Sequence, residues 1–239
     1  MPGADPRAMS HSWLFTGPPG SGRSLAAIDF AAALMCTDPE EPGCGRCEAC
    51  RAVLETKQHT DLVLVDPQEV IIPVDTVREV IGRAASLPTV APWRVVIFNN
   101  ADRLNNNGAN ALLKTVEEPP ARTVIIMCAP SDAPEDFSQT LRSRCRHLYI
   151  PSPSVESITA QLVSEGASDH DAHLAALTSL RHVGRARRLV NDPAVQKRRA
   201  VAINLAEEVF HGSQGFQAVT SLLKMVDSEA KESHKDQEE

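Results

Sequence analysis

The sequence has few aromatic residues, no long apolar run and no excess of positive charge. Two Trp, one Tyr and six Phe stand among 239 residues, so a core must be built mainly from Ala, Val, Leu and Ile. No run approaches the ~18 apolar residues that a membrane-spanning helix requires. The first residues also lack the charged and then apolar layout of a secretory signal. We therefore expect a cytoplasmic protein with no membrane partner.

The formal net charge of −7 argues against a protein that holds nucleic acid through its overall field. Residues 228–239 carry five acids against two lysines, and subtracting this −3 from −7 leaves a charge of −4 on the rest of the chain. Contact with nucleic acid would need a local basic face or a partner protein.

Apolar strand patterns alternate with helical patterns over roughly the first 150 residues. The expected strands are 13–16, 61–66, 94–98, 123–128 and 147–150, of which the last three read as buried. The expected helices are 23–35, 48–57, 76–86 with Asp75 as a cap, and 107–118. This alternation predicts an α/β domain whose parallel sheet is covered on both faces.

The composition changes after residue 150. A Pro-Ser-Pro-Ser linker occupies 151–154, and the pattern is then entirely helical to about Gly212, followed by one more helix over 215–226 and the acidic tail. We therefore predict three parts: an α/β domain over 1–150, a small all-helical domain over 151–212, and a further segment over 213–239.

A glycine-rich loop lies between the first strand and the first helix. Its spacing, GxxxxG[KR][ST], is that of a phosphate-binding loop, in which backbone N–H groups and a helix N-terminus face an anion. The candidate nucleotide-binding residues are Gly17, Gly20, Gly22, Arg23 and Ser24. Arginine replaces the usual lysine, and its larger planar group cannot place one compact ammonium at the phosphates. A glycine-rich turn without a ligand is the alternative.

The strand over 94–98 ends in Asn99-Asn100. A P-loop ATPase needs an Asp there to hold Mg²⁺, usually with a Glu beside it to activate water. An amide carries no charge to balance the metal and is not a base. We therefore expect that this chain does not hydrolyse ATP by itself, while binding of ATP or ADP stays open.

Four cysteines crowd into a segment of fifteen residues, as Cys36, Cys44, Cys47 and Cys50. In a cytoplasmic chain this crowding predicts a tetrahedral structural Zn²⁺ site with no open position. Four unrelated thiols, or a redox pair at 47 and 50, are the alternatives. The other two cysteines, Cys128 and Cys145, lie in apolar strand contexts and are expected to be packing residues.

Several segments together resemble the bacterial clamp-loader ATPases of DNA polymerase III. They are Ser12-Trp-Leu-Phe-Thr-Gly-Pro, the cysteine segment, the motif NALLK-x-x-EEPP over 110–120, and Leu141-Arg-Ser-Arg-Cys145. They cover most of residues 11–150. The resemblance implies a P-loop AAA+ domain followed by a helical lid. Arg23 and Asn99-Asn100 depart from the gamma-type members and favour the delta-prime type.

The resemblance also implies roles for two residues. In this family the arginine of the Ser-Arg-Cys motif, here Arg144, crosses a subunit interface and senses the γ-phosphate bound by its neighbour. Ser131 falls where relatives place a small polar phosphate sensor. The alternative for Arg144 is a solvated basic strand edge formed with Arg142 and Arg146.

The expected function is that of a non-hydrolysing clamp-loader subunit, with gamma/tau-type ATPases, the delta subunit, the sliding clamp and primed DNA as partners. A self-sufficient AAA+ ATPase and a zinc-dependent nucleic-acid binder are the rival hypotheses. The basic segment 181–199 has three possible roles: a second sensor arginine, a solvated charged face, or a DNA contact. Relatives have a helical segment before the loop strand and a collar domain after the lid, so a chain shortened at both ends is expected.

Overall fold

The computed structural model describes residues 10–67, 69–210, 219–220 and 223–224. Its contacts divide the chain into two compact units, Met1–Pro153 and Ser154–Glu239, and each is described by itself. The predicted domain limits at residues 150 and 212 stay predictions. The acidic tail and most of the helix predicted over 215–226 lie outside the described residues.

The first unit contains a parallel sheet of five strands in the order β2-β3-β4-β1-β5. The strands are β1 (Ser12–Thr16), β2 (Leu62–Val65), β3 (Arg94–Phe98), β4 (Thr123–Ala129) and β5 (Arg146–Tyr149). The predicted α/β fold class with a parallel sheet is therefore confirmed.

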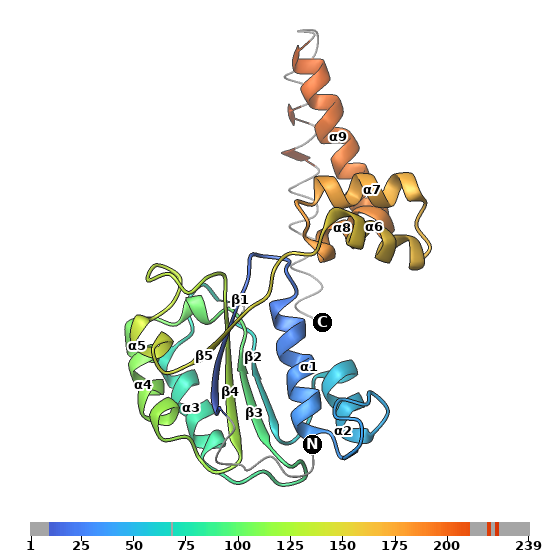
Figure 1. Cartoon of the computed structure of the whole chain (residues 1–239). Coiled ribbons are helices and arrows are strands. Elements are labelled where there is room, and N and C mark those ends of the chain that lie inside the picture. The colour runs from blue at the N-terminus through green and yellow to red at the C-terminus, as the bar shows by residue number, and fades with distance from the viewer. Residues whose placement is uncertain (1–9, 68, 211–218, 221–222, 225–239) are drawn as a thin grey trace. The chain divides into compact units, whose positions relative to one another are not determined.

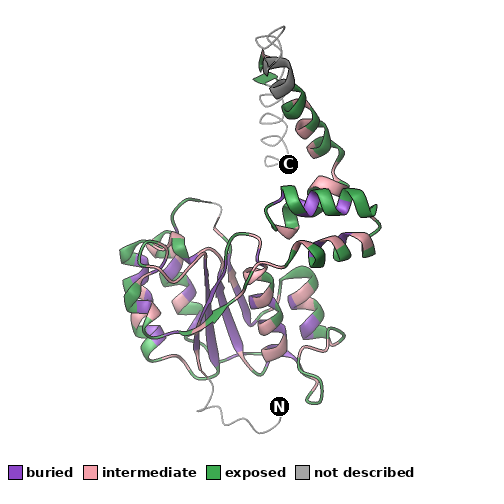
Figure 2. Cartoon of the chain, turned by 45° about the horizontal axis from the view of Figure 1, so that its top comes forward, coloured by how far each residue is buried: buried purple, intermediate pink, exposed green. Residues whose placement is uncertain are grey.

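Helices cover both faces of this sheet (Figure 1). They are α1 (Arg23–Met35), α2 (Glu48–Arg51), which continues as the π-helical turn η1 (Ala52–Thr56), α3 (Val74–Ala84), the 3₁₀ turn η2 (Ala101–Arg103), α4 (Asn106–Glu117) and α5 (Gln139–Arg142). Successive side chains of a strand point to opposite faces. Val95 and Ile97 accordingly join the core under α1, whereas Val96 and Phe98 join the core under α3 and α4. Strands β1 to β4 form the buried interior of the unit (Figure 2).

Two local predictions were wrong. Helix α3 begins at Val74 with Pro73 as its N-cap, and Asp75 lies inside the first turn, where its carboxylate pairs with Arg78 at 3.0 Å. The last strand is shifted by one residue to Arg146–Tyr149 and is mostly exposed, not buried. It forms the edge of the sheet beside β1, so only one of its sides has a neighbouring strand.

A buried ion pair joins the amino ends of β2 and β3. Arg94 donates to Asp61 at 2.8 Å, and their side chains are 8% and 0% exposed. The Asp61 carboxylate also accepts the backbone N–H groups of Thr89, Val90 and Ala91. Burial raises the pKa of Asp61, but these amide hydrogen bonds and the Arg94 guanidinium outweigh it and hold that pKa well below its usual value.

The second unit is helical, as predicted for this segment. It contains α6 (Val155–Ser164), α7 (Asp169–Thr178), α8 (Val183–Asn191) and α9 (Pro193–Phe210). Ser154 and Ser168 cap α6 and α7 by accepting backbone N–H groups. A small core of aliphatic side chains, including Ile158 and Leu162, lies between these helices. Within the described residues, no helix combines the length and the apolar character needed to cross a membrane.

Candidate functional site

The glycine-rich loop connects the carboxyl end of β1 to the start of α1. Its first glycine, Gly17, donates its N–H to the Ala129 carbonyl at 3.4 Å. A Cβ at Gly17 would overlap the carbonyl oxygen of Ile150 and the hydroxyl of Ser21, so only glycine fits there. Gly22 caps α1 with a φ of 91°, a conformation that side chains of other residues disfavour. Glycine is therefore required at Gly17 and favoured at Gly22, while the binding of a phosphate by this loop stays a prediction.

The side chain of Arg23 folds back onto this loop. Its Nη1 donates to the Gly17 carbonyl at 2.6 Å, and its Nη2 reaches the Asn100 amide oxygen at 3.4 Å. Its Nε is buried and has no hydrogen-bond partner among the described residues. The guanidinium thus links the loop to the end of β3, a contact that sequence reasoning did not predict.

The end of β3 offers amides where an ATPase needs acids. Asn99 donates its N–H to the Val65 carbonyl at 2.9 Å, while its side-chain oxygen is buried without a partner among the described residues. Asn100 adopts a left-handed conformation with a φ of 52°, which asparagine tolerates better than most residues. Asp102 is exposed in the 3₁₀ turn that follows. These amides cannot supply the charge that Mg²⁺ requires.

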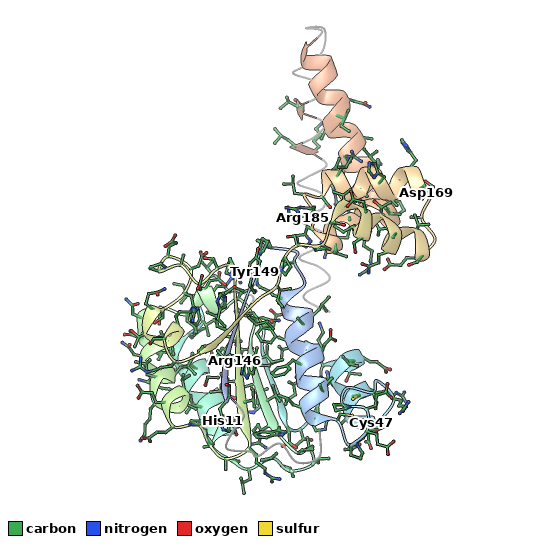
Figure 3. The ribbon with its side chains drawn as sticks, viewed as in Figure 1. His11, Cys47, Arg146, Tyr149, Asp169 and Arg185 are labelled. Atoms are coloured by element: carbon green, nitrogen blue, oxygen red, sulfur yellow. The ribbon has the colours of Figure 1, made fainter. Side chains whose placement is uncertain are left out.

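The four clustered cysteines converge on one point, beside the end of α1 and around α2. Of the four, Cys47 is labelled in Figure 3. Their sulfur atoms all lie within 4.8 Å of one another, and Cys36 Sγ is 3.7 Å from Cys44 Sγ and 3.9 Å from Cys47 Sγ. Tetrahedral zinc with Zn–S bonds of about 2.3 Å requires sulfur atoms about 3.8 Å apart. The arrangement therefore fits a metal ion held by four thiolates.

Hydrogen bonds organise this cysteine module. The N–H groups of Cys47 and Cys50 donate to the sulfur atoms of Cys44 and Cys47, each at 3.4 Å. Burial raises the pKa of Cys47, yet hydrogen bonds to its sulfur, led by that from the Thr37 backbone, bring the pKa down to about 6. Such a thiol is a ready metal ligand at neutral pH.

The remaining cysteines, Cys128 and Cys145, are buried in the two cores of the first unit. Burial raises the pKa of each thiol to about 12, so both are neutral. This placement confirms the prediction that they are packing residues.

Arg144 lies on the surface between α5 and β5. Its Nε donates to Glu117 Oε1 at 2.6 Å, and its Nη1 donates to the Thr140 carbonyl at 2.8 Å and to the Ser143 hydroxyl at 3.2 Å. The Arg144 side chain is 37% exposed. Its partner Glu117 belongs to the NALLK-x-x-EEPP motif, so this contact joins two motifs that no pattern in the sequence links.

The two neighbouring arginines have different surroundings. Arg142 pairs with Asp132 at 3.0 Å and lies 3.1 Å from the His147 ring nitrogen. Arg146 stacks 5.2 Å above the Trp13 ring and is labelled on β5 in Figure 3. The three arginines therefore do not form one continuous basic edge.

Two further candidates are held by local contacts. The Ser131 hydroxyl donates to Asp136 at 2.7 Å and accepts the Ala133 N–H at 3.1 Å, which orders the loop after β4. In the basic segment 181–199, Arg187 forms a two-point pair with Glu165 at 2.8 and 2.6 Å. These contacts leave the roles predicted for Ser131 and for the basic segment as predictions.

Comparison with known proteins shows which sequences this chain is similar to. The sequence model of a family described as DNA polymerase III, delta subunit, matches residues 4–154. The chain is 35% identical over 165 residues to the DNA polymerase III subunit delta' of Pseudomonas aeruginosa, which covers 66% of this chain and 49% of that protein. It is 34% identical over 170 residues to the subunit delta' of Escherichia coli, covering 70% of this chain and 50% of the relative.

Similarity extends to another subunit type and to a solved structure. The gamma/tau subunit of Mycobacterium tuberculosis is 33% identical over 174 residues, covering 70% of this chain and 30% of that protein. A DNA polymerase III gamma subunit-related protein from Thermotoga maritima has the same fold, with a TM-score of 0.56 and 20% identity over 92% of this chain and 69% of its own. The chain spans about half the length of the delta' proteins from Pseudomonas aeruginosa and Escherichia coli.

Proposed function

We propose that this chain, which belongs to the DNA polymerase III delta-subunit family and within it to the delta-prime proteins, is a clamp-loader subunit that does not hydrolyse ATP. In this role it would stand in a ring with gamma/tau-type ATPases and a delta subunit. The ring would place the sliding clamp on primed DNA. This chain would be a static subunit of the ring and would offer one arginine to the ATP site of its neighbour.

The observation that carries the non-hydrolysing role is the contact of Arg23 with Asn100 at 3.4 Å. Where a P-loop ATPase has a lysine and an acid with Mg²⁺ between them, this chain has a guanidinium and an amide. A nucleotide entering the loop would meet Gly17, Gly20, Gly22, Arg23, Ser24 and Ser131 as the candidate cradle. It would find no acid at the end of β3 to hold the metal or to orient water.

Arg144 is the residue that we propose to act outside this chain, as a catalytic residue in a neighbour's site. Its exposed guanidinium suits a triphosphate bound by the adjacent subunit, since it carries a fixed positive charge and donates charge-assisted hydrogen bonds to phosphate oxygens. Arginines that act in this way raise the rate of phosphoryl transfer by about 10³–10⁵.

The cysteine module is proposed to hold zinc as a structural ion. Zinc bound by Cys36, Cys44, Cys47 and Cys50 would have no open position for a substrate. Its contribution would be to fix the segment between α1 and α2 against the core. The module therefore belongs to the stability of the subunit and not to its chemistry.

The first test measures phosphate release by the purified chain with ATP and Mg²⁺. We expect no turnover above the buffer, and no gain with DNA. Turnover by the lone chain would overturn the non-hydrolysing role and would favour a self-sufficient ATPase.

The second test uses the complex reconstituted with gamma/tau-type and delta subunits, the clamp and primed DNA. Arg144→Ala should lower ATP hydrolysis at the adjacent site by about 10³-fold or more, with assembly unchanged. Arg78→Ala is the matched control, because Arg78 is also an exposed arginine paired with a carboxylate. Equal rates for the Arg144→Ala and Arg78→Ala complexes would contradict the role of Arg144.

A further inference from the structure

We infer that Glu117 is the positioning residue for Arg144, which it orients for a triphosphate bound by the neighbouring subunit. This inference rests on the function proposed above, because it requires that Arg144 act in trans. Glu117 is the last residue of α4, and we do not propose that it contacts the triphosphate. It acts through the hydrogen bond between its Oε1 and the Nε of Arg144, which measures 2.6 Å.

The contacts hold the guanidinium by one edge and leave another edge open. Nε is bound to Glu117, and Nη1 is bound to the Thr140 carbonyl and the Ser143 hydroxyl. Among the described residues, Nη2 has no hydrogen-bond partner. The plane of the fork is therefore fixed while the Nη2 edge stays available for phosphate oxygens.

The backbone around Arg144 is fixed as well. The Arg144 N–H donates to the Leu141 carbonyl at 3.0 Å, and the Cys145 N–H donates to the Arg142 carbonyl at 3.2 Å. Cys145 is buried in the core. The base of the side chain is thus held by the backbone, and the hydrogen bond to Glu117 restricts the side-chain rotations.

The physical benefit is that less conformational entropy is lost when the phosphate binds. A free arginine side chain loses much rotamer freedom when it is ordered, and ordering it beforehand lowers that loss at the moment of reaction. The same carboxylate also lowers the net positive charge near the phosphate. Its removal should therefore lower the turnover number without weakening the attraction for ATP.

The chain supplies a matched control in the next residue. Glu118 is exposed like Glu117 and carries the same charge, but no hydrogen bond or ion pair of its side chain is present among the described residues. Glu118→Ala changes the net charge of the surface in the same way as Glu117→Ala and leaves Arg144 oriented.

The experiment measures steady-state ATP hydrolysis by the reconstituted clamp-loader complex, with assembly checked by size-exclusion chromatography. Glu117→Ala should lower kcat about three- to fivefold with KM for ATP unchanged or lower. Glu117→Gln keeps an oxygen that accepts from Nε and should lie between the wild type and Glu117→Ala. Glu118→Ala should match the wild type.

A double variant separates positioning from a structural role. In an Arg144→Ala background, Glu117→Ala should cause no further loss of kcat, because its target is gone. A further loss there, a wild-type kcat for Glu117→Ala, or an equal loss for Glu118→Ala would overturn the inference. A wild-type rate for Arg144→Ala alone would instead overturn the proposed role of Arg144, so the two failures are distinguishable.

Discussion

Two arginine side chains lie at opposite ends of the parallel strands, and their partners differ in charge. Arg94, at the amino end of β3, donates to the Asp61 carboxylate at 2.8 Å. Arg23, beyond the carboxyl end of β1, donates to the Gly17 carbonyl at 2.6 Å and reaches the Asn100 amide oxygen at 3.4 Å. The first guanidinium is neutralised by a buried acid, whereas the second is surrounded by neutral oxygen atoms.

This difference separates the amino end of the sheet, where an ion pair stabilises the fold, from the carboxyl end, where the candidate ligand site lies. A buried charge is tolerated when an opposite charge and further hydrogen bonds compensate it, as Asp61 and Arg94 do for each other. At the carboxyl end, the cation stands at a helix N-terminus, which already favours anions, without a local acid. Under the function proposed above, the loop would attract anions, and the chain would lack the groups for hydrolysis.

The largest effect on stability is expected when the buried ion pair between Asp61 and Arg94 is broken. Asp61→Asn removes the charge that Arg94 faces and leaves that buried guanidinium with neutral partners only, among them the Arg83 and Ser86 carbonyls. Removing one partner of a buried pair costs roughly 3–5 kcal/mol, so the midpoint of urea unfolding should fall while its slope stays constant. Asp66→Asn is the matched control, because Asp66 follows the same strand at its other end and is exposed.

Asp66→Asn should change stability by less than about 0.5 kcal/mol. If both variants unfolded at the same urea concentration, the buried pair would have no special part in stability, and the contrast between the two ends of the sheet would fail.

The cysteine module is a third place where charge should be compensated, by a metal ion for its thiolates. We expect one zinc per chain and a loss of about 2.7 kcal/mol on chelation, relative to free zinc at a hundred times its Kd. Cys44→Ser should abolish zinc binding, whereas Cys145→Ala should keep one zinc per chain. Metal analysis together with thermal unfolding measures both. Unchanged stability on complete zinc removal would contradict a structural role.

Acid should lower the free energy of unfolding by protonating Asp61 and so weakening its ion pair with Arg94. The pKa of Asp61 is held well below its usual value in the folded chain, so its contribution to stability is complete above the unfolded value of about 3.9. It is lost as the pH falls from there through the folded pKa. Over that window the free energy of unfolding should fall by up to about 1.4 kcal/mol per pH unit more in the wild type than in Asp61→Asn. Parallel pH profiles from urea unfolding would count against this pair.

The sequence predicted the bounds of two central elements correctly. Helix α1 runs over the predicted residues Arg23–Met35, and β3 has the predicted bounds and is buried throughout. The buried state predicted for the last strand was wrong because a strand pattern does not reveal whether it has neighbours on both sides. β5 turned out to be an edge strand with exposed Leu148 and Tyr149.

The functional contacts were harder to predict because they join residues far apart in the sequence. Arg23 and Asn100 meet across β4, which lies between β1 and β3, so no local pattern links them. Glu117 and Arg144 are 27 residues apart and belong to two motifs that were each recognised alone. The four cysteines were predictable as a site because their spacing is short, and their sulfur atoms do converge.

The smallest effect on stability is expected when an acid is introduced beside Arg23, which has only neutral partners. Asn100→Asp would place a carboxylate where an amide oxygen now faces Arg23, in imitation of Asp61 and Arg94. Because Arg23 and Asn100 are only partly buried, the gain should be at most about 1 kcal/mol. Asn204→Asp on α9 is the control, since Asn204 is exposed and has no hydrogen-bond partner among the described residues.

The added acid should also lower the affinity of the loop for inorganic phosphate, because it cancels the charge of Arg23 and repels the anion. Urea unfolding and phosphate titration by calorimetry measure the two consequences on the same samples. A chain that becomes less stable, or that binds phosphate as well as the wild type and Asn204→Asp do, would show that Arg23 is not an uncompensated charge. Arg94 and Arg23 would then differ in the charge of their partners, but this difference would not change the free energy of either site.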